Sequence, residues 1–122
     1  AKPNTLPPEG TGLVLEAIPI LETVAAESET PYTHRLIGDA YLEIGLLEAA
    51  KASYETVLAL SVEGDGRENR AAAQVGLANI SAVEGDRIQA EARLQQARVN
   101  YVLSGEDDRR KQVERWIGEL RF

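Results

Sequence analysis

An internal repeat with an offset of forty residues is the feature that most constrains the fold of this 122-residue chain. The pair Ile37-Gly38 aligns with Leu77-Ala78 and again with Ile117-Gly118. Four further matches keep the same offset: Gly45 with Gly85, Ala50 with Ala90, Tyr54 with Leu94, and Val57 with Ala97. A period of this size is typical of repeat proteins, in which each unit is one supersecondary motif that buries its apolar face against its neighbours. The sequence therefore predicts an array of similar units rather than a globule without internal order.

Each unit is predicted to be a pair of helices. Apolar residues recur at helical spacing from Gly12 almost to the end, and no stretch shows sustained strand alternation. Thr30 followed by Pro31 is a helix start signal, and Asp86 with Gln89 has the spacing of a capping box. The expected helices are 13–27, 31–44, 47–60, 71–84, 87–103 and 106–120. For the first of them Pro19 leaves two alternatives, a helix that begins there or a helix that is kinked there.

The domain organisation follows from a change in composition near residue 12. Residues 1–11 contain three prolines and little apolar content, which predicts an extended tail or linker. Residues 12–122 are predicted to form one helical domain. The chain lacks an initiator Met, which leaves open a processed end, a trimmed end or a removed anchor. Localisation stays undetermined: the cytoplasm is favoured, and a membrane tether through a removed N-terminal segment is the alternative.

Composition excludes several classes of function. The chain has no Cys, so it can form neither a disulfide nor a thiolate metal site, and His34 is its one histidine. The formal net charge of −7 repels phosphate backbones and predicts no nucleic-acid binding. There is no apolar run long enough to insert into a membrane. No residue stands in a nucleophile, phosphate-loop or calcium-loop pattern, so we expect no enzyme activity, no catalytic residues, no metal and no cofactor.

The repeat resembles the tetratricopeptide repeat family. The first unit has the small, aromatic and turn residues at the family's spacings, and the second has most of them, with Ser81 in the place of an aromatic. The residues that carry the resemblance are Ile37-Gly38, Tyr41, Gly45, Ala50, Tyr54 and Val57, then Leu77-Ala78, Gly85, Ala90, Leu94 and Ala97. The family's closing Pro is replaced by Val62 and Val102, and the period is about six residues longer than usual. The resemblance implies a right-handed α-solenoid of about five to six antiparallel helices.

The resemblance also implies where a partner binds. In the family, the first helix of each unit lines a concave groove that receives a peptide or a partner helix. The matching candidate partner-binding residues here are Tyr32, Arg35, Asp39, Leu42, Glu43, Val75, Asn79 and Val83. Asp39 stands where the family's carboxylate-gripping variants have Asn, which argues against a carboxylate clamp. Trp116, on the last expected helix, is interpreted as a cap over the final repeat.

The expected function is therefore that of a noncatalytic interaction module that binds another protein or peptide as an adaptor, scaffold or assembly factor. The alternative is a self-association module that forms a weak homodimer or a larger homo-oligomer through its terminal helices. The two hypotheses use different surfaces of the same fold.

Overall fold

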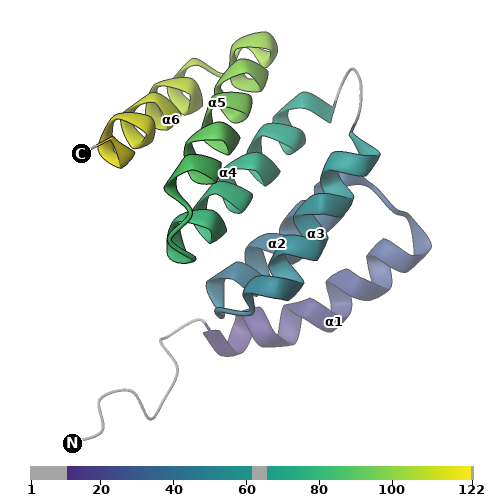
Figure 1. Ribbon diagram of the computed structural model, residues 1–122. Helices are drawn as coiled ribbons and strands as arrows, with labels where there is room; N and C mark the ends of the chain where they lie inside the picture. The colour runs from purple at the N-terminus through teal and green to yellow at the C-terminus, as the bar shows by residue number, and fades with distance from the viewer. Residues whose placement is uncertain (1–10, 62–65, 122) are drawn as a thin grey trace, which may run out of the picture.

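The computed structural model describes residues 11–61 and 66–121, and every regular element within these ranges is an α-helix. The six helices are α1 (Thr11–Glu27), α2 (Pro31–Glu43), α3 (Leu47–Leu60), α4 (Arg67–Val83), α5 (Arg87–Ser104) and α6 (Asp107–Leu120). Consecutive helices run in opposite directions and pack side by side (Figure 1). The described part of the chain is thus all-α, as predicted.

The predicted helix boundaries rest on capping residues that the structure contains. The Thr30 hydroxyl accepts a hydrogen bond from the backbone N–H of Thr33 at 3.2 Å, and Pro31 is the first helical residue of α2. Asp86 caps α5 in the same way, by accepting from the backbone N–H of Gln89 at 3.0 Å. The turns after α2, α4 and α5 each contain a glycine with positive φ, at Gly45, Gly85 and Gly105.

Two predicted helix starts need correction. The helix α1 begins at Thr11 and continues through Pro19, because Pro19 and Leu15 both lie on its exposed side, where water can bond the carbonyl that a proline leaves unpaired. The helix α4 begins at Arg67, four residues before the predicted start. The polar first turn is held to the end of α3 by Arg70, whose guanidinium donates to the carbonyl of Leu58 at 2.8 Å. Residues 1–10 of the predicted tail and 62–65 of the predicted loop lie outside the described residues.

Among the described residues, the core consists of two clusters, and α4 contributes to both of them. The first joins α3 to α4, through Ala50, Tyr54, Val57, Ala73, Leu77 and Ile80. The second joins α4, α5 and α6, through Ala71, Ala78, Leu94, Ala97, Tyr101, Val113 and Ile117. The alanines at the repeat positions, Ala50 and Ala90, are completely buried. Small residues thus allow close approach of the paired helices, as the repeat predicts.

Tyr54 is the largest side chain that is completely buried, and it lies between two glycines. A Cβ atom added to Gly38 on α2 would lie 2.7 Å from the Tyr54 ring, and one added to Gly76 on α4 would lie 2.3 Å from it. The ring therefore occupies space that only glycine leaves free on both helices. This packing brings α2 and α4 into direct contact with each other.

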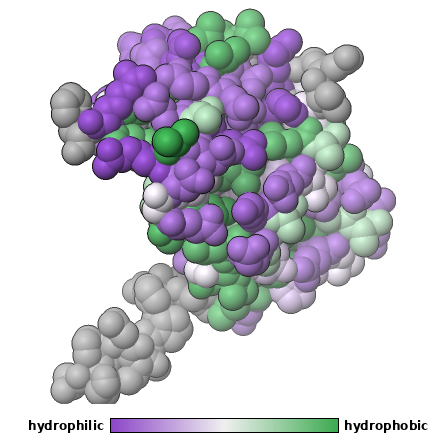
Figure 2. All heavy atoms as spheres, viewed as in Figure 1, coloured by the Kyte–Doolittle hydropathy of each residue, from purple (hydrophilic) through white to green (hydrophobic). Residues whose placement is uncertain are grey.

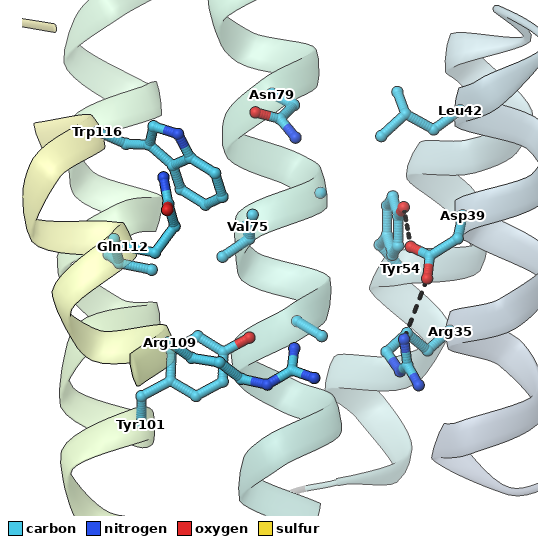
Figure 3. Close-up of a pocket in the computed structure, with 13 residues that line it drawn as sticks. Arg35, Asp39, Leu42, Tyr54, Val75, Asn79, Tyr101, Arg109, Gln112 and Trp116 are labelled. Atoms are coloured by element: carbon cyan, nitrogen blue, oxygen red, sulfur yellow. Dashed lines mark hydrogen bonds and ion pairs between the residues drawn. The ribbon is translucent and has the colours of Figure 1, made fainter. Parts of the chain in front are cut away.

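The helices α2, α4 and α6 together line one side of the molecule. On the face seen in Figure 2, hydrophilic residues cover most of the part formed by α5 and α6. The apolar residues Val113 and Ile117 of α6 are turned inward instead, against α4 and α5. The one partly buried aromatic residue of α6, Trp116, lies toward the space between α6 and α4 (Figure 3).

Candidate functional site: a groove between α2, α4 and α6

A cavity of about 260 Å³ lies between α2, α4 and α6. Tyr54 of α3 and Tyr101 of α5 contribute to its lining from the helices behind. Its lining residues are Arg35, Asp39, Leu42, Tyr54, Ala72, Val75, Gly76, Asn79, Tyr101, Arg109, Gln112, Val113 and Trp116. Figure 3 shows the side chains of α2 and α6 facing one another across α4. We call this cavity the groove.

The α2 wall of the groove is held by a network of polar contacts. The Arg35 guanidinium forms an ion pair with Asp39 at 3.1 Å and donates to the side-chain carbonyl of Asn69 at 3.0 Å. The Tyr54 hydroxyl donates to the other oxygen of Asp39 at 2.5 Å. The same guanidinium lies 5.3 Å from the centre of the Tyr32 ring, within the range of a cation–π contact. Each charged group of this wall therefore has a fixed position before any ligand arrives.

The environment of Tyr54 raises the pKa of its phenol above the ordinary value, so the hydroxyl stays protonated even in alkaline solution. Burial raises its pKa, and the hydrogen bond to Asp39 raises it further. The neutral hydroxyl is therefore a permanent donor to the carboxylate. Since Asp39 accepts from both Tyr54 and Arg35, its two oxygens are already engaged on the groove side.

The α4 floor of the groove is formed by small and apolar residues with one free amide. Val75 is half-buried and Gly76 is buried against the Tyr54 ring. Asn79 is exposed, and its side chain makes no hydrogen bond to another described residue. The floor can thus accept an apolar group beside Val75 and offer both a donor and an acceptor at Asn79.

The α6 wall contributes a cation, an amide and the single tryptophan. Arg109, Gln112 and Trp116 project from α6 toward α4 in Figure 3. Arg109 lies beside Tyr101: burial raises the pKa of that phenol, and the neighbouring guanidinium opposes part of the rise. No ion pair involves Arg109 among the described residues, whereas Arg110 next to it pairs with Asp107 and Glu114. Arg109 is therefore held beside the Tyr101 hydroxyl but has no carboxylate partner among the described residues, so it can still pair with an anionic group of a ligand.

The structure places five of the eight predicted binding residues in the lining of the groove: Arg35, Asp39, Leu42, Val75 and Asn79. Tyr32 lies outside the cavity but next to it, 54% exposed, over the Arg35 guanidinium. Glu43 and Val83 are the last residues of α2 and α4 and do not line the groove. The contribution of these two helices was thus largely predictable from the repeat register.

The contribution of α6 to the groove was not predicted from the sequence. Trp116, interpreted as a cap, both packs against the second core cluster and lines the groove. Its equivalent at the repeat offset is Gly76, and Gln112 is equivalent to Ala72, both of which also line the groove. Extending the register of the first helices to the third unit would have found both residues.

His34 lies away from the groove, in a second cavity of about 460 Å³ between α1, α2 and α3. Its Nε2 atom is buried without a hydrogen bond and lies 3.4 Å from a carboxylate oxygen of Glu29. Within residues 11–61 and 66–121, no three His, Cys, Asp or Glu side chains gather closely enough to hold a metal ion. None of the helices described is both long and apolar enough to cross a membrane.

Comparison of the chain with protein-family models, with curated proteins and with solved structures gave no match.

Proposed function

We propose that this protein is a noncatalytic interaction module that holds a peptide or a helix of a partner protein in the groove between α2, α4 and α6. In this proposal the helix pairs α2–α3 and α4–α5 are tetratricopeptide-like units of a right-handed solenoid. The forty-residue repeat supports it, as does the direct contact between α2 and α4, which are the first helices of successive units. The lining of one groove by three equivalent helices is what such an array produces.

The observation that carries the proposal is the combination of side chains in the groove. Val75, Leu42 and Trp116 give apolar surface for one or two partner side chains. Asn79, Gln112 and Arg109 surround that surface with groups that hydrogen-bond a peptide backbone or an acidic side chain. The α2 wall is already ordered by its own contacts, so binding there costs little conformational entropy.

A displayed library of random peptides, selected on the intact 122-residue chain, tests this proposal. The enriched peptides are then titrated by calorimetry against two matched double variants. The groove variant is Asn79→Ala with Arg109→Glu. The control is Gln89→Ala with Arg93→Glu, which also removes one side-chain amide and reverses one arginine charge, but on α5, outside the groove.

We expect the groove variant to weaken the enriched peptides by at least about tenfold, because buried polar contacts lose their partners. The control should change affinity by less than about twofold, and that change should fade with added salt. Equal losses in both variants, or selection that enriches no peptide above an unrelated helical protein, would refute the groove as a binding site.

A further inference from the structure

A smaller cavity, of about 180 Å³, lies between α4, α5 and α6 and adjoins the groove, because Asn79 and Trp116 line both cavities. Its other lining residues are Ala78, Ala82, Leu94, Glu119 and Leu120. We call the two cavities together the extended groove. It follows α6 from Arg109 to Glu119, which are ten positions apart, so it is about 15 Å long at the rise of an α-helix. This length suits a short segment of a partner chain rather than a single side chain.

The two ends of the extended groove carry opposite charges. Its charged lining residues are Arg35, Asp39, Arg109 and Glu119. Arg35 and Asp39 pair with each other, whereas Arg109 and Glu119 form no ion pair within the described part of the chain. Figure 3 shows Arg35 and Arg109 toward one end of the groove and Trp116 toward the other, and Glu119 follows Trp116 by one turn of α6. The extended groove thus has a cation without a carboxylate partner at one end and a carboxylate without a cationic partner at the other.

The surroundings of Arg109 leave its charge open to the groove. The helices α2, α4 and α6 run parallel, because consecutive helices alternate in direction, so the positive ends of their three dipoles lie together at the Arg109 end (Figure 1). The Tyr101 hydroxyl, and then the carboxylates of Glu68 and Glu106, raise the pKa of Arg109. Neither carboxylate pairs with Arg109 or lines the extended groove. A ligand in the groove meets the guanidinium directly, while water screens the carboxylates outside.

We propose that the extended groove selects its partner segment by charge: an acidic side chain of the segment pairs with Arg109, and a basic side chain pairs with Glu119. This inference rests on the proposed function and adds the chemistry of the partner to it. Between the two charges, an apolar side chain of the segment lies against Val75 and Trp116. An extended chain advances about 3.3 Å per residue, so the two charged residues are about four or five positions apart. A basic group at Arg109, or an acidic group at Glu119, brings like charges together and lowers affinity.

The peptides that the intact chain selects from a random library are the first test. Long-range attraction to a protein with a formal net charge of −7 would by itself enrich basic peptides, so an acidic residue is the informative feature. We expect the enriched peptides to share an acidic residue, a basic residue about four or five positions away and an apolar residue between them. Enriched peptides that are neutral or purely basic would overturn this inference and leave the proposed function standing. A selection that enriches no peptide would overturn both.

Charge reversal on both sides of each contact is the second test, measured by calorimetry. One enriched peptide is acetylated and amidated so that only its side chains are charged, and its acidic residue is replaced by Lys in a second peptide. Both are titrated against the unmodified chain, Arg109→Glu and the control Lys111→Glu, which lies on α6 but does not line the extended groove. The other end is tested with Glu119→Lys, with the control Glu55→Lys on α3, and with a third peptide whose basic residue is replaced by Glu. Thermal unfolding of each variant confirms that it is folded.

We expect each reversed peptide to bind the unmodified chain at least about tenfold more weakly than the selected peptide, because a charged contact is lost and like charges meet. Arg109→Glu should bind the Lys peptide better than the selected one, and Glu119→Lys should prefer the Glu peptide in the same way. The two controls should change every affinity by less than about twofold. Reversed peptides that bind the unmodified chain as well as the selected peptide, a preference that the groove variants do not reverse, or a reversal in either control would overturn the inference.

Discussion

The two complete helix pairs fill the space between their helices with different residues. In the pair α2–α3, Gly38 accommodates the ring of Tyr54, and the hydroxyl of that ring reaches Asp39. In the pair α4–α5, the equivalent residues are Ala78 and Leu94, both buried in a cluster of apolar side chains. One pair thus combines the smallest residue with a large polar aromatic, and the other combines alanine with an aliphatic.

This difference explains why the groove has one rigid polar wall. Tyr54 passes between α2 and α4 and orients Asp39, which in turn orients Arg35. Leu94 has no polar group, so nothing equivalent fixes the side of α4 that faces α6, and Asn79 there keeps its hydrogen-bonding capacity. The residue that fills the core of the first unit therefore also sets the chemistry of the site.

The largest expected effect tests the close approach at Gly38. Gly38→Leu should lower the free energy of unfolding by about 3 kcal/mol or more, because even its Cβ would overlap the Tyr54 ring. Gly118→Leu is the matched control at the equivalent position, where nothing lies within 4 Å. Chemical denaturation of both variants should show a large loss in the first and none in the second. A stable Gly38→Leu variant would contradict the packing of the first unit.

Truncation of Leu94 tests the apolar packing between the helices of the second unit. Leu94→Ala should reduce stability by about 2 to 3 kcal/mol, because it leaves a cavity among Ala78, Val113 and Ile117. The measurement is the midpoint of denaturant unfolding at constant slope. A loss below about 1 kcal/mol would mean that α6 collapses onto α4 without it, and that the second unit is less tightly packed than the first.

Removal of the Tyr54 hydroxyl tests the polar contact that this residue adds to the packing of the first unit. Tyr54→Phe should reduce stability by about 1 to 2 kcal/mol, because Asp39 loses one of its two donors while the ring still fills the space. Peptides selected for the groove should also bind this variant more weakly, since the α2 wall is less ordered. Unchanged stability together with unchanged binding would show that the Tyr54 hydroxyl contributes neither to the fold nor to the groove.

The loss of stability at alkaline pH is a smaller expected effect, and its direction follows from the raised pKa of Tyr54. Because the pKa of Tyr54 is higher in the folded than in the unfolded protein, its contribution is complete below about pH 10 and is lost as the pH rises above that value. The melting temperature should therefore fall above pH 10, and it should fall less in Tyr54→Phe. Tyr101 and Tyr41, whose pKa values are also raised, account for the fall that remains in the variant.

Much of the fold was predictable because its determinants are local. Thr30, Asp86 and the glycines at 45, 85 and 105 act on their own turns, and the sequence shows them directly. The residues of α2 and α4 in the groove followed from the register of the repeat. The contact between Tyr54 and Asp39 was not predictable, since it joins side chains fifteen positions apart on different helices. The close contact of Gly76 with the Tyr54 ring was not predictable either, because that ring comes from another helix.

A double-mutant cycle that replaces residues 38 and 54 of the first unit with the equivalent residues of the second, Ala and Leu, tests most directly whether these two positions pack as one unit. Gly38→Ala alone should be destabilising, and so should Tyr54→Leu alone. If Ala and Leu at positions 38 and 54 fill the same space as Gly and Tyr do, the two changes should compensate for each other. The loss of stability in the double variant should then be smaller than the sum of the two single losses by about 1 to 3 kcal/mol. Denaturant unfolding of the four proteins measures this coupling. Additive losses, with a coupling below about 0.5 kcal/mol, would contradict this packing and show that residues 38 and 54 act independently.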